Sequence, residues 1–170
     1  MRKRIAATAA AVLVCAVVVA DQAKAQAATP PLARMSARND VGIELLGKAL
    51  IYSFTYQRMV AKSLGLEVGI GALGGGSSGE NTTVVFLPVS AKIYLIPKDG
   101  SLYLTAGAVL VTAAVDEGPF DGSASNFYGQ VGLGFEFRSA GGFLFRGTAY
   151  GLFADGGYFI WPGLTLGYAF

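Results

Sequence analysis

Large apolar residues occupy every second position through most of this chain, and this alternation limits the folds open to it more than any other feature. In the closing segment 163–170 the large residues are Leu164, Leu166, Tyr168 and Phe170, and the residues between them are Gly163, Thr165, Gly167 and Ala169. A period of two is typical of β-strands with one apolar face. Further segments of this kind lie near 62–73, 82–96, 101–115, 124–138, 142–153 and 158–170. The pattern predicts an all-β protein.

The first 25 residues have the layout of a secretory signal peptide. Arg2, Lys3 and Arg4 precede an uncharged apolar stretch, and Ala23 and Ala25 flank a small-x-small cleavage site. This stretch is shorter than the about 20 residues that a membrane-spanning helix needs. We therefore predict a signal peptide over 1–25, a flexible periplasmic lead-in over 26–40 and the strand-forming domain over 41–170.

Removal of that leader changes the charge of the chain. The full sequence has a net charge of +2, but cleavage after Ala25 would leave 9 of the 13 basic and 10 of the 11 acidic residues, a net charge of −1. No basic region remains of the kind that binds nucleic acid. We expect no nucleic-acid partner.

The chain has no histidine and one cysteine. Catalytic devices that use a histidine base are therefore excluded, as are disulfide frameworks and thiolate zinc sites. The sequence predicts no enzyme activity, no cofactor and no metal site.

The alternating strands fit either a soluble barrel or a membrane barrel. The weakly apolar face consists of Gly, Ala, Ser and Thr with few charges, which would make a poor surface towards water. The other face is bulky and continuous, as a surface towards lipid must be, and a closed barrel satisfies all its backbone groups within lipid. We favour the membrane barrel, with a soluble lipocalin-like carrier of an apolar ligand as the alternative.

Turns and aromatic residues support the same interpretation. Tight turns at 97–100 and 139–142 are expected to alternate with open polar loops at 74–81, 116–123 and 154–157. Aromatic residues near the strand ends predict two interfacial girdles. One girdle comprises Tyr56, Tyr94, Tyr103, Phe137, Phe143 and Phe170, and the other Phe127, Phe153, Phe159 and Trp161.

The number of strands follows from a change of phase in the segment 41–58. The apolar positions change parity between Leu45 and Leu46. A break at Gly47-Lys48 would divide the segment into two strands and give an even total of eight, as a barrel with both termini on one side requires. One long strand with a β-bulge is the alternative.

The end of the chain resembles the C-terminal assembly signal of bacterial outer-membrane proteins, with Leu164, Leu166, Tyr168 and Phe170 in the positions of its apolar residues. More broadly, residues 41–170 resemble the small OmpA/OmpX-like barrels, on Leu45-Leu46-Gly47, the segment 52–56 and the closing segment. The resemblance implies a location in the bacterial outer membrane, contact with its lipid, and the barrel-assembly machinery as a partner during biogenesis. It does not identify a ligand.

Five charged residues fall on the inward face of the predicted strands: Glu67, Lys92, Glu136, Arg138 and Arg146. An inward charge in a narrow barrel is costly unless it is paired. We expect an ion-pair network that plugs the lumen, and a gate or solute site is the alternative. The sequence thus predicts a non-catalytic barrel with a structural, adhesive or surface-binding role, and a small pore or transporter for small solutes as a second possibility.

Overall fold

The computed structural model describes residues 33–77, 80–96, 98–117, 120–154 and 157–170, and for 76–77, 80–81, 115–117 and 120–122 it describes the backbone alone. The predicted signal peptide, with Ala23 and Ala25, lies outside these residues and stays a prediction.

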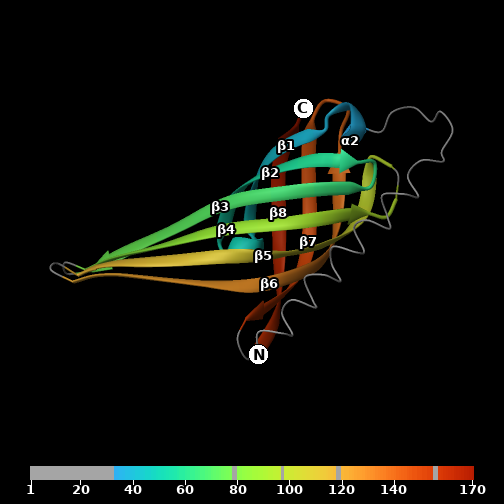
Figure 1. The fold of residues 1–170 in the computed structure, drawn as a ribbon. Helices are drawn as coiled ribbons and strands as arrows, with labels where there is room; N and C mark the ends of the chain where they lie inside the picture. The colour runs from blue at the N-terminus through green and yellow to red at the C-terminus, as the bar shows by residue number, and fades with distance from the viewer. Residues whose placement is uncertain (1–32, 78–79, 97, 118–119, 155–156) are drawn as a thin grey trace. The chain divides into compact units, whose positions relative to one another are not determined.

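Eight antiparallel strands form one closed barrel in chain order, and β1 pairs with β8 to close it (Figure 1). The prediction of eight strands is confirmed. The strands are β1 (Asn39–Leu46), β2 (Tyr52–Ala61), β3 (Leu64–Ser77), β4 (Glu80–Tyr94), β5 (Gly100–Glu117), β6 (Phe120–Arg138), β7 (Phe143–Ala154) and β8 (Gly157–Ala169). Two short helices accompany them, α2 (Ala33–Ser36) and η2 (Gly47–Ala49).

The break that the phase change predicted at Gly47-Lys48 is confirmed, because η2 separates β1 from β2 there. Leu46, Gly47 and Leu50 all have positive φ, at 58°, 68° and 69°. This region is open to glycine but costly for leucine. The backbone is therefore locally strained at the two leucines, where η2 connects two strands of opposite apolar phase.

The exterior of the barrel is apolar and the interior is polar. Outward residues of β1 and β2 such as Ile43, Phe54 and Val60 are about half exposed, whereas Glu44, Ser53 and Gln57 between them are buried. This arrangement is the reverse of a soluble barrel and is the one that a lipid environment requires. Within the described part of the chain, no helix is long and apolar enough to cross a bilayer.

The prediction of open loops at 74–81 and 116–123 is wrong, because strands continue through most of both segments. β3 to β6 have 14, 15, 18 and 19 residues, whereas about 9–11 residues cross a membrane. β3 pairs with β2 only as far as Ile70, and β6 pairs with β7 only from Gly129. The parts beyond this level, 71–77, 80–86, 111–117 and 120–126, form a four-stranded extension that we call the wing (Figure 1).

Glycine, serine and aspartate are turn residues in isolation, which explains why the sequence pattern indicated loops there. In the folded chain the described residues of these segments pair with a neighbouring strand, from Gly71↔Phe86 to Ser77↔Glu80 in one hairpin and from Val111↔Asn126 to Glu117↔Phe120 in the other. Cross-strand pairing outweighs the weak intrinsic preference of these residues. The third expected loop, 154–157, shortens in the same way, because Ala154 pairs with Gly157.

Two of the expected girdle residues are also corrected. Tyr94 and Tyr103 lie inside the barrel, 5% and 0% exposed, where they pair across β4 and β5. Both have the parity of the inward positions, since Lys92 precedes Tyr94 by two residues. Their aromatic side chains led to the prediction of an outward position, but the alternation along the strand decides which face a residue occupies. Other members of the same girdle are exposed, among them Tyr56, Phe137, Phe143 and Phe170.

The lead-in predicted over 26–40 is structured in its described part. α2 occupies Ala33–Ser36, and β1 begins at Asn39, two residues before the expected start of the barrel at 41. Asp40 is fully buried within the barrel. The described part of this segment therefore belongs to the barrel.

A charge on the outer face distinguishes the membrane level from the wing. Leu104 and Thr112 both point outward on β5, Leu104 at the barrel and Thr112 in the wing. We expect Leu104→Arg to cost about 2–4 kcal/mol of unfolding free energy in lipid vesicles and Thr112→Arg at most about 1 kcal/mol. Urea titrations measure both; equal costs would contradict the lipid-facing assignment.

Candidate functional site: the charged lumen

All five sequence-predicted lumen residues lie inside the barrel and are at most 2% exposed. Glu136 and Arg146 are register partners on β6 and β7, and Arg146 Nε lies 2.6 Å from Glu136 Oε2. The structure brings all five into one continuous network of ion pairs, to which further charged residues belong.

Asp40 connects Arg138 and Arg146 at the end of the barrel where Asn39 and Phe170 pair, which we call the terminal end. Its Oδ2 accepts hydrogen bonds from Arg138 at 2.6 Å and from Arg146 at 2.8 Å. Glu136 lies on the other side of the same arginines, with Oε1 3.4 Å from Arg138 Nε. The hydroxyl of Tyr94 donates to Glu136 Oε2 at 2.6 Å. Two carboxylates and two guanidinium groups thus neutralise one another in a space closed to solvent.

Glu67 connects this group to a second one. It forms ion pairs with Lys92, with Lys48 at 2.7 Å and with Arg146 at 3.5 Å. Lys48 also lies 3.0 Å from Glu44. The hydroxyl of Tyr150 donates to Glu44 at 2.7 Å. The charges therefore run through the lumen as one chain from Arg138 to Glu44.

The sequence analysis missed four charged members of this network. They are Arg34, Asp40, Glu44 and Lys48, each at most 1% exposed. Glu44 had a usable signal, because it alternates with Ile43 and Leu45 and so falls on the inward face. Asp40 shares the parity of Glu44 on β1, but it lies in the segment expected to be a lead-in. Arg34 and Lys48 lie in α2 and η2, where no strand period exists to place a side chain.

Helix α2 closes the terminal end of the lumen with Arg34. Its guanidinium donates to the carbonyls of Ile96 at 3.2 Å and Lys98 at 2.5 Å, and lies 4.4 Å from the centre of the Tyr94 ring. Burial lowers the pKa of Arg34, and the nearby Glu136 carboxylate opposes that change. Arg138 binds the same segment by donating to the Ala37 carbonyl at 2.7 Å.

Helix η2 closes the opposite end. The Tyr128 hydroxyl donates to the Lys48 carbonyl, and the Trp161 indole donates to the Leu50 carbonyl at 3.1 Å. Ala49 packs with Phe86 and Val109 in a small apolar cluster. An apolar seal thus lies beyond the charged layer at this end, and a peptide segment closes the lumen on each side.

The charged side chains of the lumen form ion pairs with one another. Nine buried charges, five basic and four acidic, interact mainly with one another (Arg34, Lys48, Lys92, Arg138, Arg146, Asp40, Glu44, Glu67 and Glu136). Among the residues that the structure describes, no cluster of His, Cys, Asp and Glu could hold a metal ion. Each carboxylate has at least one basic partner, as burial in a narrow interior demands.

The pair Glu136–Arg146 tests this network by a double-mutant cycle. Glu136→Gln should cost about 3 kcal/mol of unfolding free energy, because it leaves the two buried guanidinium groups of Arg138 and Arg146 to share the carboxylate of Asp40, with only Glu67 in addition at Arg146. The double variant with Arg146→Gln should cost less than the sum of the single variants, by about 1–3 kcal/mol. Urea unfolding in vesicles gives all four values; strict additivity would contradict the pairing.

No protein-family model and no curated protein sequence matches the chain, but solved structures match its fold. The N-terminal β-barrel domain of Pseudomonas aeruginosa OprF aligns with a TM-score of 0.57 at 12% identity, over 78% of this chain and 95% of that one. Ail, the attachment invasion locus protein of Yersinia pestis, in complex with the heparin analogue sucrose octasulfate, aligns with a TM-score of 0.50 at 16% identity, over 78% and 94%. The chain is therefore an eight-stranded β-barrel of the outer-membrane type, with the fold of these small bacterial barrels.

Proposed function

We propose that this chain is an integral outer-membrane protein with a sealed, non-conducting lumen that acts at the cell surface through its wing. The filled lumen carries this proposal. A solute path would have to pass the Arg34 closure, the ion-pair network and the apolar seal at η2 in turn. Barrels of eight strands have interiors that side chains can fill, and this one follows that rule.

The sealed interior also supports a non-catalytic role. The buried carboxylates are held by lysine, arginine and tyrosine partners. A general base or nucleophile needs access to a substrate, and both mouths are closed by peptide segments. The acid and base groups of the lumen therefore serve the stability of the barrel.

The wing supports a surface-binding role. The chain terminus Phe170 lies at the end of the barrel opposite the wing, as the pairing of β1 with β8 shows (Figure 1). If the termini face the periplasm, as in other barrels of even strand number, the wing projects outside the cell. The Tyr52 hydroxyl donates to the Ala72 carbonyl at 2.7 Å, and beyond it residues 73–77 of β3 have no strand partner on the β2 side and contain neither a charge nor a proline. Such an edge can accept an extended peptide as an additional strand.

The charge of the wing indicates what kind of peptide it would accept. Its sequence contains Glu80, Asp116, Glu117 and Asp121 and no lysine or arginine. Ail was solved with a polyanionic ligand, but an acidic wing repels polyanions. We therefore propose that the wing binds extended segments with basic side chains.

The sealed lumen predicts an absence of conductance. The purified chain should show no channels in planar bilayers, and Glu136→Ala should lower the temperature at which the folded form is lost without producing channels. The physical reason is that Arg34 keeps its hydrogen bonds to the carbonyls of Ile96 and Lys98 without this carboxylate, and that η2 at the other end makes no contact with it. New conductance in Glu136→Ala would instead support a gate, and conductance of the unsubstituted chain would overturn the sealed lumen.

A wing-shortened variant tests the surface-binding role. Deletion of 76–81 and 115–122 leaves the pairs Gly74↔Thr83 and Ala113↔Ala124 to close the hairpins. A fluorescent decapeptide of alternating lysine and valine should bind the full-length chain in nanodiscs, and its affinity for the shortened chain should be at least tenfold lower. Fluorescence anisotropy measures both affinities. A glutamate–valine decapeptide and sucrose octasulfate serve as controls and should not bind. Equal binding of the lysine–valine peptide to both chains would contradict the proposal.

A further inference from the structure

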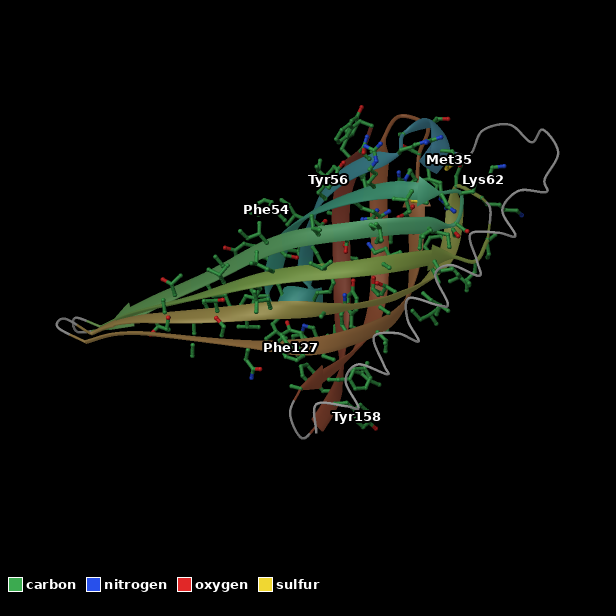
Figure 2. All side chains as sticks on the ribbon, in the orientation of Figure 1. Met35, Phe54, Tyr56, Lys62, Phe127 and Tyr158 are labelled. Carbon is green, nitrogen blue, oxygen red and sulfur yellow. The ribbon has the colours of Figure 1, made fainter. Side chains whose placement is uncertain are left out.

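A hollow lies on the outer face of the barrel, away from both the lumen and the wing. It has a volume of about 740 Å³ and extends over β8, β1, β2 and β3. Its walls are large outward side chains, including Phe54 and Tyr56, which lie on the same side of β2 in Figure 2. The remaining large members of the wall are Val41, Ile43, Val68, Ile70, Leu166 and Tyr168.

Glycines on the inner side of the same strands explain why the wall is hollowed here. Gly42, Gly69 and Gly167 occupy inward positions beneath the hollow. A Cβ at Gly42 would lie 2.9 Å from Thr165 Cγ2, and one at Gly167 would lie 3.0 Å from Gly42 Cα. Because glycine has no side chain to fill the space beneath these strands, the strands lie closer to the barrel axis here. The outer surface is therefore concave at this place.

The hollow occupies the half of the barrel nearest the chain terminus. Val41, Tyr56 and Tyr168 form its outermost row, since Val41 pairs with both tyrosines. The next outward residue of β2 is Arg58, which pairs with Asn39 at the first position of β1. Successive outward residues of a strand are about 7 Å apart. A basic residue therefore stands one row beyond the apolar wall, towards the membrane surface.

Two exposed arginines mark this end of the hollow. Arg58 donates to Asn39 Oδ1 at 3.3 Å, and the Tyr56 hydroxyl donates to the same oxygen at 2.9 Å. Arg38 is also exposed, and its carbonyl accepts a hydrogen bond from Met59, the residue after Arg58. An apolar hollow that ends at two guanidinium groups is complementary to a molecule with a hydrocarbon chain and an anionic head.

We infer that this hollow binds one phospholipid of the periplasm-facing leaflet, with an acyl chain along Ile43, Tyr56 and Val68 and an anionic headgroup at Arg58 and Arg38. The inference rests on the proposed membrane location. Arginine is suited to the phosphate because its planar fork donates two parallel hydrogen bonds. A second copy of the chain is a poorer occupant, since two concave faces related by a two-fold axis leave a void between them.

Lipid selectivity tests the inference. The full chain is reconstituted in phosphatidylcholine vesicles with spin-labelled phosphatidylglycerol or phosphatidylcholine, and electron paramagnetic resonance gives the relative association constant of the motionally restricted lipid. We expect phosphatidylglycerol to be preferred at least fivefold, and Arg58→Gln to reduce the preference about fivefold, the contribution of one basic residue at a membrane surface. Lys98→Gln, at an exposed turn of the same end, is the matched control and should leave it unchanged.

Filling the hollow provides an independent variant. Val68 and Val131 are both outward valines, 50% and 48% exposed, and only Val68 lines the hollow. Val68→Trp should reduce the preference for phosphatidylglycerol at least threefold, and Val131→Trp should not change it.

The outcomes separate the inference from the proposed membrane location. A restricted lipid component without selectivity, or an equal loss in Arg58→Gln and Lys98→Gln, would overturn the lipid site and leave the membrane barrel intact. The absence of any restricted component would overturn the membrane location itself.

Discussion

Lipid offers no hydrogen bonds, and this constraint determines both surfaces of the protein. The backbone satisfies itself by closing eight strands into a ring. Outward positions are then left to apolar side chains, so every polar side chain at membrane level must point inward. In a ring this narrow the inward side chains touch, and buried charges are accommodated by pairing with charges of opposite sign. The network from Arg138 to Glu44 is the result.

The barrel could be predicted from the sequence because its strongest signal, the period of two, is also the physical requirement of a lipid-facing strand. Strand number followed from the same signal, through the loss of phase before Gly47. Strand length did not, because pairing in the wing depends on neighbours far along the chain, and residues such as Gly74 and Asp116 carry no local mark of a strand. At Tyr94 the aromatic residue type predicted an outward position and the alternation along the strand an inward one, and the side chain lies inward.

The lumen could be predicted only where a strand carries the residue. Parity places Glu67, Lys92 and Glu136 inward from their neighbours alone. Arg34 and Lys48 reach the same space from short helices, whose side-chain directions depend on how the chain turns at either end of the barrel. No periodic pattern of three or four residues encodes such a turn. The charged residues carried by the two short helices are therefore the ones that the sequence does not reveal.

Asp40 has a consequence for the order in which the barrel assembles. It lies on the first strand, yet its partners Arg138 and Arg146 follow it by about a hundred residues. These partners lie on β6 and β7, and the closed ring of β1 with β8 holds Asp40 against them. An interaction that needs the closed ring is expected to slow unfolding more than it accelerates folding. We therefore expect Asp40 to hold the β1–β8 seam closed and to lengthen the lifetime of the folded barrel.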